Sequence, residues 1–345
     1  MHRRPAGPPG SGASRGLPPD ILIRAASPAD FDAIHALVDA AKLPTVGLTA
    51  TALDDHGPGL VAVRGATVVG SAVVEVYDGH GLLRSVAVAP DLRGTGLGQA
   101  LVQAADDLSR DRGLARLFLL TETAAAFFAG LGFLPVARAR VPAAVQASLE
   151  FSSVCPASAL VMARRTGPLP AGDGVRARAA RATDVEAIAA IYNAGIEERV
   201  ATFETRPRTA ADVRAWLDGR HPVVVLEVIE PDGATRVVAF AATSAYRPRA
   251  CYDGVAEFSV YVARDQRGRG LGRRALAALE AAAREAGFWK LLSRIFVENT
   301  ASRRLMERAG FREVGVYERH ARLDGAWRDV VIVEKLLDEL ARAGD

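Results

Sequence analysis

A short glycine-rich segment occurs twice in this chain of 345 residues, and it constrains the fold more than any other feature. The first copy is Arg93-Gly-Thr-Gly-Leu-Gly98 and the second is Arg267-Gly-Arg-Gly-Leu-Gly272. Half the length of the chain separates the copies, an apolar run precedes each, and a helical pattern of apolar residues follows each. The repeat predicts two domains that are built on one plan.

The glycines of each copy are suited to holding an anion. Because glycine has no Cβ, several backbone N–H groups of such a loop can point at one phosphate, and the N-terminus of the following helix adds a favourable dipole. The spacing is not the G-x-G-x-x-G of dinucleotide-binding folds, and no Gly-Lys-Ser/Thr follows as in nucleotide triphosphate loops. A glycine turn that only starts a helix is the remaining alternative, and the duplication weakens it.

Composition excludes several classes of function. Hydrophobic residues make up 50% of the chain and charged residues 24%, and the net charge of +3 comes from interspersed charges, so we expect neither nucleic acid nor a membrane as partner. No apolar run has the length of a transmembrane segment. The two cysteines, Cys155 and Cys251, cannot form a disulfide framework or a four-ligand zinc site, which favours a reducing, cytoplasmic location.

The apolar periodicity divides the chain into four parts. Residues 1–20, rich in Pro, Gly, Ser and Arg, are expected to be a disordered tail without the apolar block of a secretory signal. A first domain spans 21–165, a linker without an apolar period spans 166–174, and a second domain spans 175–340. The expected strands are residues 21–24, 60–63, 68–76, 82–88, 117–120 and 158–162, then 175–178, 223–229, 236–243, 256–262, 291–297 and 330–336. The last of them is expected to close the second sheet.

The loops and the segments after them carry a more specific pattern. Q/R-x-x-G-x-G/A after an apolar strand is filled by Arg93, Gly96 and Gly98 and by Arg267, Gly270 and Gly272, and a Gly-Phe pair follows in each domain, at Gly132-Phe133 and Gly310-Phe311. This pattern resembles the acetyl-CoA pyrophosphate loop of the GCN5-related N-acetyltransferase (GNAT) superfamily. The resemblance implies an α/β chain of the α+β kind, with two GNAT folds in tandem, each a mixed, mostly antiparallel twisted sheet flanked by helices. It also implies acetyl-CoA as co-substrate and no metal.

Amine acetylation needs a proton acceptor, because a protonated amine cannot attack a thioester. Glu257 is the candidate, since it stands in the otherwise apolar strand 256–262 directly before the second loop. Partial desolvation in such a strand makes a carboxylate a better proton acceptor. The alternative is a solvent-facing residue on an edge strand.

The second domain, from Val175 to Leu337, resembles the phosphinothricin and arsinothricin N-acetyltransferases. The matching segments are Ile191-Tyr-Asn193, Ala201-Thr-Phe-Glu-Thr205, Tyr246-Arg-Pro-Arg-Ala-Cys-Tyr252, Ala256-Glu-Phe-Ser-Val-Tyr-Val262, Val297-Glu-Asn-Thr300 and Gly325-Ala-Trp-Arg-Asp329. The resemblance implies that Glu257 is the general base. It implies substrate-binding roles for Arg247, Arg249 and Tyr252, and arginine suits substrates that carry a second oxyanion. The positions implied to hold acetyl-CoA are Val260, Tyr261, Val262, Arg267, Gly268, Arg269, Gly270, Leu271, Gly272, Arg273 and Asn299.

One position departs from the pattern of these families. Many members place a His or Tyr five residues before the aromatic residue of the Gly-Phe pair, where it assists the base or protonates the leaving thiolate, and here that residue is Met306. Solvent can protonate a coenzyme A thiolate, so the departure does not predict a loss of activity. Tyr317 and His320 are open alternatives for a helper.

The first domain resembles a second GNAT family that is associated with arsenic resistance. The matching segments are Leu82-Leu-Arg-Ser-Val-Ala-Val-Ala-Pro90, Leu119-Leu-Thr-Glu-Thr123, Ala126-Phe-Phe128, Val141-Pro-Ala-Ala144 and Phe151-Ser-Ser-Val-Cys-Pro-Ala-Ser158. The positions implied to hold acetyl-CoA are Val86, Ala87, Val88, Arg93, Gly94, Thr95, Gly96, Leu97 and Gly98. Alignment of the copies places Leu83 at Glu257, Thr121 at Asn299 and Phe128 at Met306.

The usual base is therefore absent from the first domain. Glu75, Asp78 and Glu122 are open alternatives that would act through a water, and each is equally a candidate surface acid. Cys155 suggests a thiolate ligand for arsenic, although a lone cysteine among apolar neighbours is more often a small buried hydrophobe.

The prediction for the whole chain is acetylation of the α-amine of phosphinothricin-like or arsinothricin-like amino acids, as a detoxification. One alternative is acetylation of another small amine such as methionine sulfoximine, whereas the paired arginines disfavour polyamines. Another alternative makes the first domain a sensor or scaffold that binds acetyl-CoA without turnover. The oligomeric state stays open, with a homodimer among the alternatives.

Overall fold

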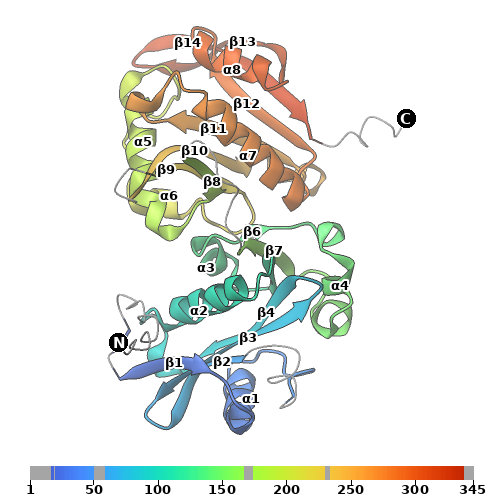
Figure 1. The fold of residues 1–345 in the computed structure, drawn as a ribbon. Helices are drawn as coiled ribbons and strands as arrows, with labels where there is room; N and C mark the ends of the chain where they lie inside the picture. Colours follow the sequence, from blue (N-terminus) through green and yellow to red (C-terminus); the bar gives the residue numbers. More distant parts are fainter. Residues whose placement is uncertain (1–16, 19, 50–58, 167–173, 230–233, 338–345) are drawn as a thin grey trace, which may run out of the picture. The chain divides into compact units, whose positions relative to one another are not determined.

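The computed structural model describes residues 17–18, 20–49, 59–166, 174–229 and 234–337. Most of the expected tail and most of the expected linker lie outside these residues. Within the described residues the strands form two seven-stranded sheets (Figure 1). The chain divides into two compact units, which are Met1–Leu117 with Ala147–Val154 and Phe118–Gln146 with Cys155–Asp345.

The first sheet has the strand order β1-β2-β3-β4-β5-β7-β6. Its strands are β1 Ile21–Ala25, β2 Gly59–Arg64, β3 Thr67–Tyr77, β4 His80–Val88, β5 Arg116–Thr121, β6 Leu134–Pro135 and β7 Leu160–Arg165. Antiparallel pairing joins β1 through β4 in succession and also joins β6 to β7.

Helices cover both faces of the first four strands. The helices of this half are α1 Phe31–Ala40, α2 Leu97–Asp111, α3 Ala125–Gly130, α4 Ala143–Gln146 and the π-helical turn Glu150–Val154. α1 buries Ile34 against Val73 of β3. α2 packs on the opposite face, where a Cβ at Gly70 would lie 2.8 Å from Leu101 Cδ1, so glycine allows the close approach of the helix.

The second sheet has the strand order β13-β14-β12-β11-β10-β9-β8. Its strands are β8 Val175–Ala179, β9 Val223–Ile229, β10 Thr235–Ala245, β11 Val255–Val262, β12 Lys290–Phe296, β13 Arg312–Leu323 and β14 Ala326–Leu336. β11 and β12 are parallel and the other neighbours are antiparallel. The expected mixed, mostly antiparallel sheets are therefore confirmed.

One long helix packs against the second sheet and contributes much of its hydrophobic core. The helices here are α5 Val185–Glu198, α6 Ala210–Arg214, α7 Leu271–Ala286 and α8 Thr300–Arg308. α7 lies across β9, β10 and β11 (Figure 1), and its predicted apolar face of Leu271, Ala275 and Leu279 is buried. No helix in the described ranges combines the length and the apolar character that crossing a membrane requires.

The strand predictions hold, with ends shifted by a few residues, and two strands were not predicted. One is β6, which has only two residues. The other is β13, a strand whose side chains are exposed along almost its whole length. The prediction that 330–336 closes the sheet is wrong, because β13 is the edge strand and β14 lies between β13 and β12.

Candidate functional site

The two central strands of the second sheet run in parallel and then separate. β11 pairs with β12 only as far as the Glu257↔Leu292 pair. Both strands continue beyond it, to Val262 and Phe296, while the other edge of β11 stays paired with β10. Within the described residues, the edge of β11 after Glu257 therefore leaves backbone N–H and C=O groups for a ligand that carries amides.

The second glycine loop follows directly and leads into α7. Gly268 and Gly270 have φ values of 78° and 75°, in the left-handed region that favours glycine, and Gly270 is the N-cap of α7. A Cβ at either residue would meet nothing within 4 Å, whereas a Cβ at Gly272 would lie 3.1 Å from Leu305 of α8. The loop thus leaves space beside a helix N-terminus, a geometry that is suited to an anion.

The arginine of this loop has protein partners. The Nε of Arg267 donates to the carbonyl of Val262 at 3.2 Å, and its Nη1 lies 3.0 Å from both carboxylate oxygens of Glu198 at the end of α5. Arg264 also donates to Glu198, at 2.6 Å. Burial acts to raise the pKa of Glu198, but the hydrogen bonds from the two arginines outweigh it and lower that pKa. Glu198 therefore ties the end of α5 to the loop, a contact that the sequence did not suggest.

Glu257 is held by an arginine on the neighbouring strand. The Nη1 and Nη2 of Arg294 donate to its two carboxylate oxygens at 3.0 and 2.8 Å. The side chains are 25% and 38% exposed, so the pair is open to solvent and to a substrate. Glu257 shares its face of β11 with Tyr261, whose ring lies 4.8 Å from that of Tyr192 on α5, whereas Phe258 packs in the core beneath α7.

Sequence reasoning missed Arg294, although a signal for it was present. Arg294 interrupts the apolar strand β12 in the way that Glu257 interrupts β11. It lies two residues after Leu292, the register partner of Glu257, and therefore on the same face of the sheet. The structure brings two interruptions of opposite charge together where the strands begin to separate.

The predicted substrate residues lie in the turn after β10. Arg247 stacks over the ring of Tyr246 at 5.2 Å, and Tyr246 meets Tyr252 edge-on at 5.3 Å. Hydrogen bonding to Tyr246 raises the pKa of Arg247, with smaller contributions from Tyr252 and from Tyr317 of β13. Arg249 is exposed on the same turn. This turn and β13 therefore present cationic and phenolic groups together.

Tyr317 and His320, the alternatives for a proton donor, lie together on β13. Their rings are 5.4 Å apart, and the side chain of Tyr317 is largely exposed. The ring of His320 also lies 6.1 Å from that of Phe203.

Asn299 and Met306 have structural roles in this state of the protein. The side-chain amide of Asn299 donates to the carbonyl of Val200 at 2.9 Å, and its oxygen caps α8 by accepting the N–H of Ser302 at 3.0 Å. Met306 is 4% exposed and packs in the core with Phe311. Its apolar side chain therefore fills the core at the position where the family resemblance implied a His or Tyr.

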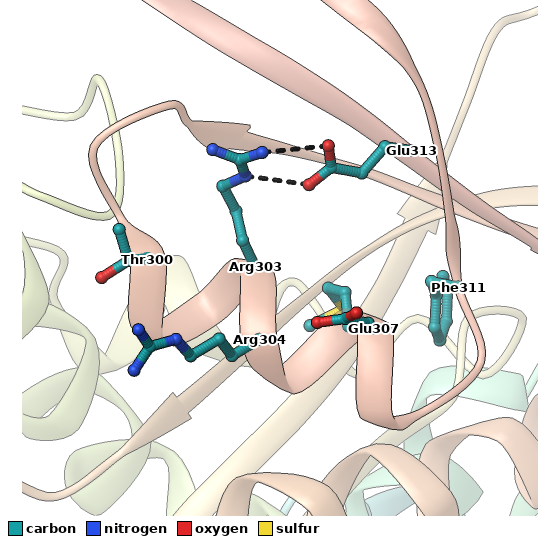
Figure 2. A pocket seen from close by; sticks show the side chains of 7 residues that line it. Thr300, Arg303, Arg304, Glu307, Phe311 and Glu313 are labelled. Atoms are coloured by element: carbon teal, nitrogen blue, oxygen red, sulfur yellow. Dashed lines mark hydrogen bonds and ion pairs between the residues drawn. The ribbon is translucent and has the colours of Figure 1, made fainter.

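A separate cavity of about 430 Å³ lies along α8 (Figure 2). Its lining residues are Thr300, Arg303, Arg304, Met306, Glu307, Phe311 and Glu313. Arg303 pairs with Glu313 through two hydrogen bonds of 2.8 and 3.0 Å at one side of the cavity. None of the lining residues is a predicted catalytic or substrate-binding residue, so we place the site at the separation of β11 and β12 instead.

Comparison with known proteins decides the family. The model of the acetyltransferase (GNAT) family matches residues 28–133 and 188–311. The chain belongs to the acetyltransferase (GNAT) family. Since the model matches twice, the chain carries two GNAT domains in tandem.

Relatives of this GNAT chain match about half of it. An L-methionine sulfoximine/L-methionine sulfone acetyltransferase of Pseudomonas paraeruginosa is 34% identical over 165 residues, which are 47% of this chain and 94% of that protein. A phosphinothricin N-acetyltransferase of Streptomyces coelicolor is 32% identical over 174 residues, which are 49% of this chain and 100% of that protein. One similar solved structure is that of a GNAT superfamily phosphinothricin acetyltransferase from Sinorhizobium meliloti in complex with acetyl-CoA. Its sequence is 28% identical to this chain, the match covers 48% of this chain and 90% of that one, and the TM-score is 0.44.

The first GNAT domain repeats the loop geometry. Gly94 and Gly96 have φ values of 79° and 90°, and Gly96 is the N-cap of α2. The Nε of Arg93 donates to the carbonyl of Val88 at 3.3 Å, as Arg267 does to Val262. Both GNAT loops thus present the same backbone to a ligand.

The residues that stand for the catalytic positions in this first GNAT domain are mostly apolar. Leu83 is buried, and Phe128 is buried against Phe133. The hydroxyl of Thr121 accepts the N–H of Ala124 at 3.0 Å. These side chains offer no proton acceptor.

The alternative acids and the cysteine of the first GNAT domain differ in their surroundings. Glu75 is half-buried among charged partners, whereas Asp78 and Glu122 are exposed. Cys155 has intermediate exposure. Among the described residues, no group of three or more His, Cys, Asp or Glu side chains is placed to hold a metal ion.

Proposed function

We propose that the second GNAT domain transfers an acetyl group from acetyl-CoA to the α-amine of small amino acids that carry a second oxyanion. Phosphinothricin and arsinothricin are the candidate substrates. The observation that carries the proposal is the place of Glu257, at the point where β11 and β12 separate and directly before the glycine loop. Acylation removes the positive charge of the amine, which would detoxify an amino-acid antibiotic, herbicide or arsenical.

The residues present fit acetyl-CoA. The N-terminus of α7 and the open space at Gly268 and Gly270 suit a pyrophosphate, and the free edge of β11 suits the amides of the pantetheine arm. When bound, acetyl-CoA supplies the acetyl group as a thioester. The Nε and Nη1 of Arg267 are engaged by Val262 and Glu198, so we propose that its other terminal nitrogen, Nη2, donates to the pyrophosphate.

The roles of the side chains follow from their positions. Glu257 accepts the proton of the substrate amine, and Arg294 holds its carboxylate in place through two hydrogen bonds, beside the free edge of β11. Arg247 and Arg249 bind the carboxylate and the second oxyanion of the substrate, for which the planar guanidinium is suited. The leaving thiolate takes its proton from solvent. The side chains of Tyr317 and His320 are exposed to the same solvent.

A second candidate substrate is methionine sulfoximine, which the name of the Pseudomonas paraeruginosa relative favours. Its sulfoximine group is not an oxyanion, so it gives the paired arginines one anionic group instead of two. The experiment is a thiol-release assay on the whole chain with acetyl-CoA and each of phosphinothricin, arsinothricin and methionine sulfoximine. We expect faster release with the two oxyanion substrates, and equal or faster release with methionine sulfoximine would replace this assignment. Absence of release with all three would overturn it.

A further inference from the structure

The sheet beside Glu257 carries small side chains. On the face that Glu257 shares with Tyr261, β10 places Ser244 directly opposite Glu257 and Ala242 opposite Ser259. Residues that are directly opposite in an antiparallel pair have Cβ atoms roughly 4.5–5.5 Å apart, so the hydroxyl of Ser244 is a near neighbour of the Glu257 carboxylate. An amine that is bound at Glu257 therefore lies beside this hydroxyl.

The Ser244 hydroxyl is available to a ligand. Ser244 is exposed, and its hydroxyl has no hydrogen-bond partner in the part of the chain that the structure describes. The preceding residue, Thr243, shows the contrast, because it lies on the opposite face, is 4% exposed and donates its hydroxyl to the carbonyl of Pro222 at 3.0 Å. Of these two hydroxyls, the one beside Glu257 is the one that a substrate can use.

The other neighbours of Glu257 on this face offer less to a substrate carboxylate. Its register partner on β12 is Leu292, which is apolar. Arg294 uses both of its terminal nitrogens for the carboxylate of Glu257 itself. Ser259 lies two residues further along β11, toward the free edge of the strand, where the proposed function places acetyl-CoA. Ser244 is therefore the neighbour whose hydroxyl can donate to a second group of the substrate.

The course of β10 indicates which substrate group meets this hydroxyl. β10 ends at Ala245, one residue after Ser244, and the turn that carries Arg247 and Arg249 follows at once. In an α-amino acid the carboxylate is bonded to the carbon that carries the amine, so an amine at Glu257 brings the carboxylate to the immediate neighbours of Glu257. An α-carboxylate that points from Glu257 toward the two arginines meets Ser244 first.

A donor at this place also reduces an electrostatic cost. The carboxylate of Glu257 and the α-carboxylate of a substrate carry the same charge, and their repulsion opposes binding of the amino acid with its amine at Glu257. A hydroxyl that donates to the α-carboxylate offsets part of this repulsion, since a hydrogen bond to a charged group is stronger than one between neutral groups. An amine without a carboxylate has no such cost, so the contribution of Ser244 depends on the α-carboxylate.

The first domain differs here because its strand β4 contains a β-bulge. The β3–β4 register passes from Ser71↔Ala87 to Val73↔Arg84, so β4 carries one extra residue in between, near Ser85. Ser85 has a φ of 52°, in the left-handed region. The β10–β11 register has no such shift.

Beyond the bulge, the first domain has other residues at both positions. Leu82 takes the place of Glu257, and its register partner Glu75 takes the place of Ser244. Glu75 accepts hydrogen bonds from the hydroxyl of Tyr77 at 2.6 Å and from an arginine of β4 at 2.8 Å. The pair of carboxylate and hydroxyl is thus a feature of the second domain.

We infer that Ser244 is a substrate-binding residue of the second domain and that its hydroxyl donates to the α-carboxylate of the amino acid whose amine is at Glu257. The inference rests on the proposed function, which places acetyl transfer at Glu257. It gives Ser244 a share in the preference for α-amino acids over plain amines, whatever group ends the side chain of the amino acid.

The test compares substrates in pairs that differ only in the α-carboxylate. Phosphinothricin and methionine sulfoximine are each measured beside the amine in which hydrogen replaces the α-carboxylate, and thiol release from acetyl-CoA by the whole chain gives kcat/KM. We expect the parent to prefer each amino acid to its amine. Ser244→Ala should lower this preference by about tenfold, through the KM of the amino acid, and should leave kcat/KM for the amines within about threefold of the parent, which also shows that the variant is folded.

Two further variants define the role of the hydroxyl. Ser244→Thr keeps a hydroxyl and should retain most of the preference. Thr235→Ala removes an exposed hydroxyl from the other end of β10 and should leave the preference unchanged. An unchanged preference in Ser244→Ala, or an equal loss for amino acids and amines, would overturn the inference.

The result for Ser244 is separable from the result for the proposed function. The preference is a ratio within each pair, so faster release with methionine sulfoximine than with phosphinothricin would replace the oxyanion assignment and leave the role of Ser244 intact. Fast acetylation of phosphinothricin with an unchanged preference in Ser244→Ala would remove Ser244 from the site and leave the proposed function intact.

Discussion

Glu257 is held in a two-pronged pair, and this determines how its carboxylate can act. Both of its oxygens accept a hydrogen bond from Arg294, yet each carboxylate oxygen has two lone pairs, so a proton can still be accepted without breaking the pair. The fork also fixes the plane of the carboxylate. We therefore treat Glu257 as the proton acceptor and Arg294 as the residue that positions it.

The first prediction concerns the base itself. Glu257→Gln should lower kcat for the preferred oxyanion substrate by roughly 10²–10⁴-fold, because the amide keeps the shape of the side chain but cannot accept the proton. The affinity for acetyl-CoA, measured by calorimetry, should stay the same. A rate within about threefold of the parent would contradict the role of Glu257.

The second prediction separates position from charge at Arg294. Arg294→Met should lower kcat by up to about fivefold and leave the KM for the amine nearly unchanged, because the two-pronged bond that positions Glu257 is lost and a solvent-exposed ion pair of this kind is worth about 0.2–1 kcal/mol. Arg294→Lys keeps the positive charge but not the two-pronged hydrogen bond, so its kcat should lie between those of the parent and of Arg294→Met. Steady-state kinetics with the three proteins decides the matter, and a rise in KM with unchanged kcat would show instead that Arg294 binds the substrate.

The sequence could single out Glu257 and the loop glycines because each depends on local context. An acid in an apolar strand and glycines before a helix are visible within a few residues of each other. The contact of Glu198 with Arg267 could not be predicted in the same way, because it joins residues that are far apart in the chain. Arg294 had a local signal, but its pairing with Glu257 depends on the parallel register of two strands.

At the scale of elements, each sheet begins with the same strand-to-helix connection. Arg24 holds Asp30 with hydrogen bonds of 2.7 and 2.8 Å, and Arg178 holds Asp184 with bonds of 2.6 and 2.9 Å. In both, the aspartate also accepts a backbone N–H of the turn before the helix, and the arginine lies six residues earlier. The device fixes the direction in which α1 and α5 leave their first strands.

The third prediction is the pH dependence of this connection. The hydrogen bonds from Arg24, only partly opposed by burial, hold the pKa of Asp30 well below its ordinary value. A depressed pKa stabilises the fold above the unfolded pKa of about 4, and this stabilisation is lost as the pH falls. Asp30→Asn should therefore destabilise the first domain by about 1–3 kcal/mol at pH 7 and by less at pH 3. Urea unfolding of the parent and of Asp30→Asn at both pH values measures this. A difference in the free energy of unfolding between the two proteins that is larger at pH 3 than at pH 7 would contradict the prediction.

The edge strand β13 shows why one element escaped prediction. Its side chains are almost all exposed, so it lacks the alternation of apolar and polar residues that marks a half-buried strand. A signal did exist in Asp324-Gly325, which both have positive φ and form the kind of two-residue turn that joins hairpin strands. The strand is specified by its turn and its partner and not by its own apolar pattern.

At the scale of the whole molecule, the two GNAT domains present equivalent glycine loops. The fourth prediction is that unaltered protein binds two molecules of acetyl-CoA per chain. Gly96→Asp and Gly270→Asp form a matched pair, since each places a negative charge beside a helix N-terminus, and a Cβ at either glycine meets nothing within 4 Å. Each variant should lose one of the two sites.

Calorimetric titration of the parent, the two single variants and the double variant tests this stoichiometry. The double variant should bind no acetyl-CoA. Its thermal unfolding is measured beside that of the parent, because an aspartate at φ values of 90° and 75° strains the loop and should lower the unfolding temperature somewhat. One molecule bound per parent chain, lost in only one of the variants, would show that a single loop is functional.

The extra residue in β4 has a consequence for how duplicated enzymes diverge. After a gene duplicates, each copy can lose its nucleophile-activating acid by substitution, and an alignment then records the copy as inactive. A single inserted residue has a different effect, because it rotates one strand past its neighbour and brings a new side chain to the old location without any change in the loop. The β3–β4 register passes from Ser71↔Ala87 to Val73↔Arg84, so the extra residue of β4 brings Leu82, and not Leu83, to the place that Glu257 has in the second domain, and a comparison by alignment column alone compares the wrong residue.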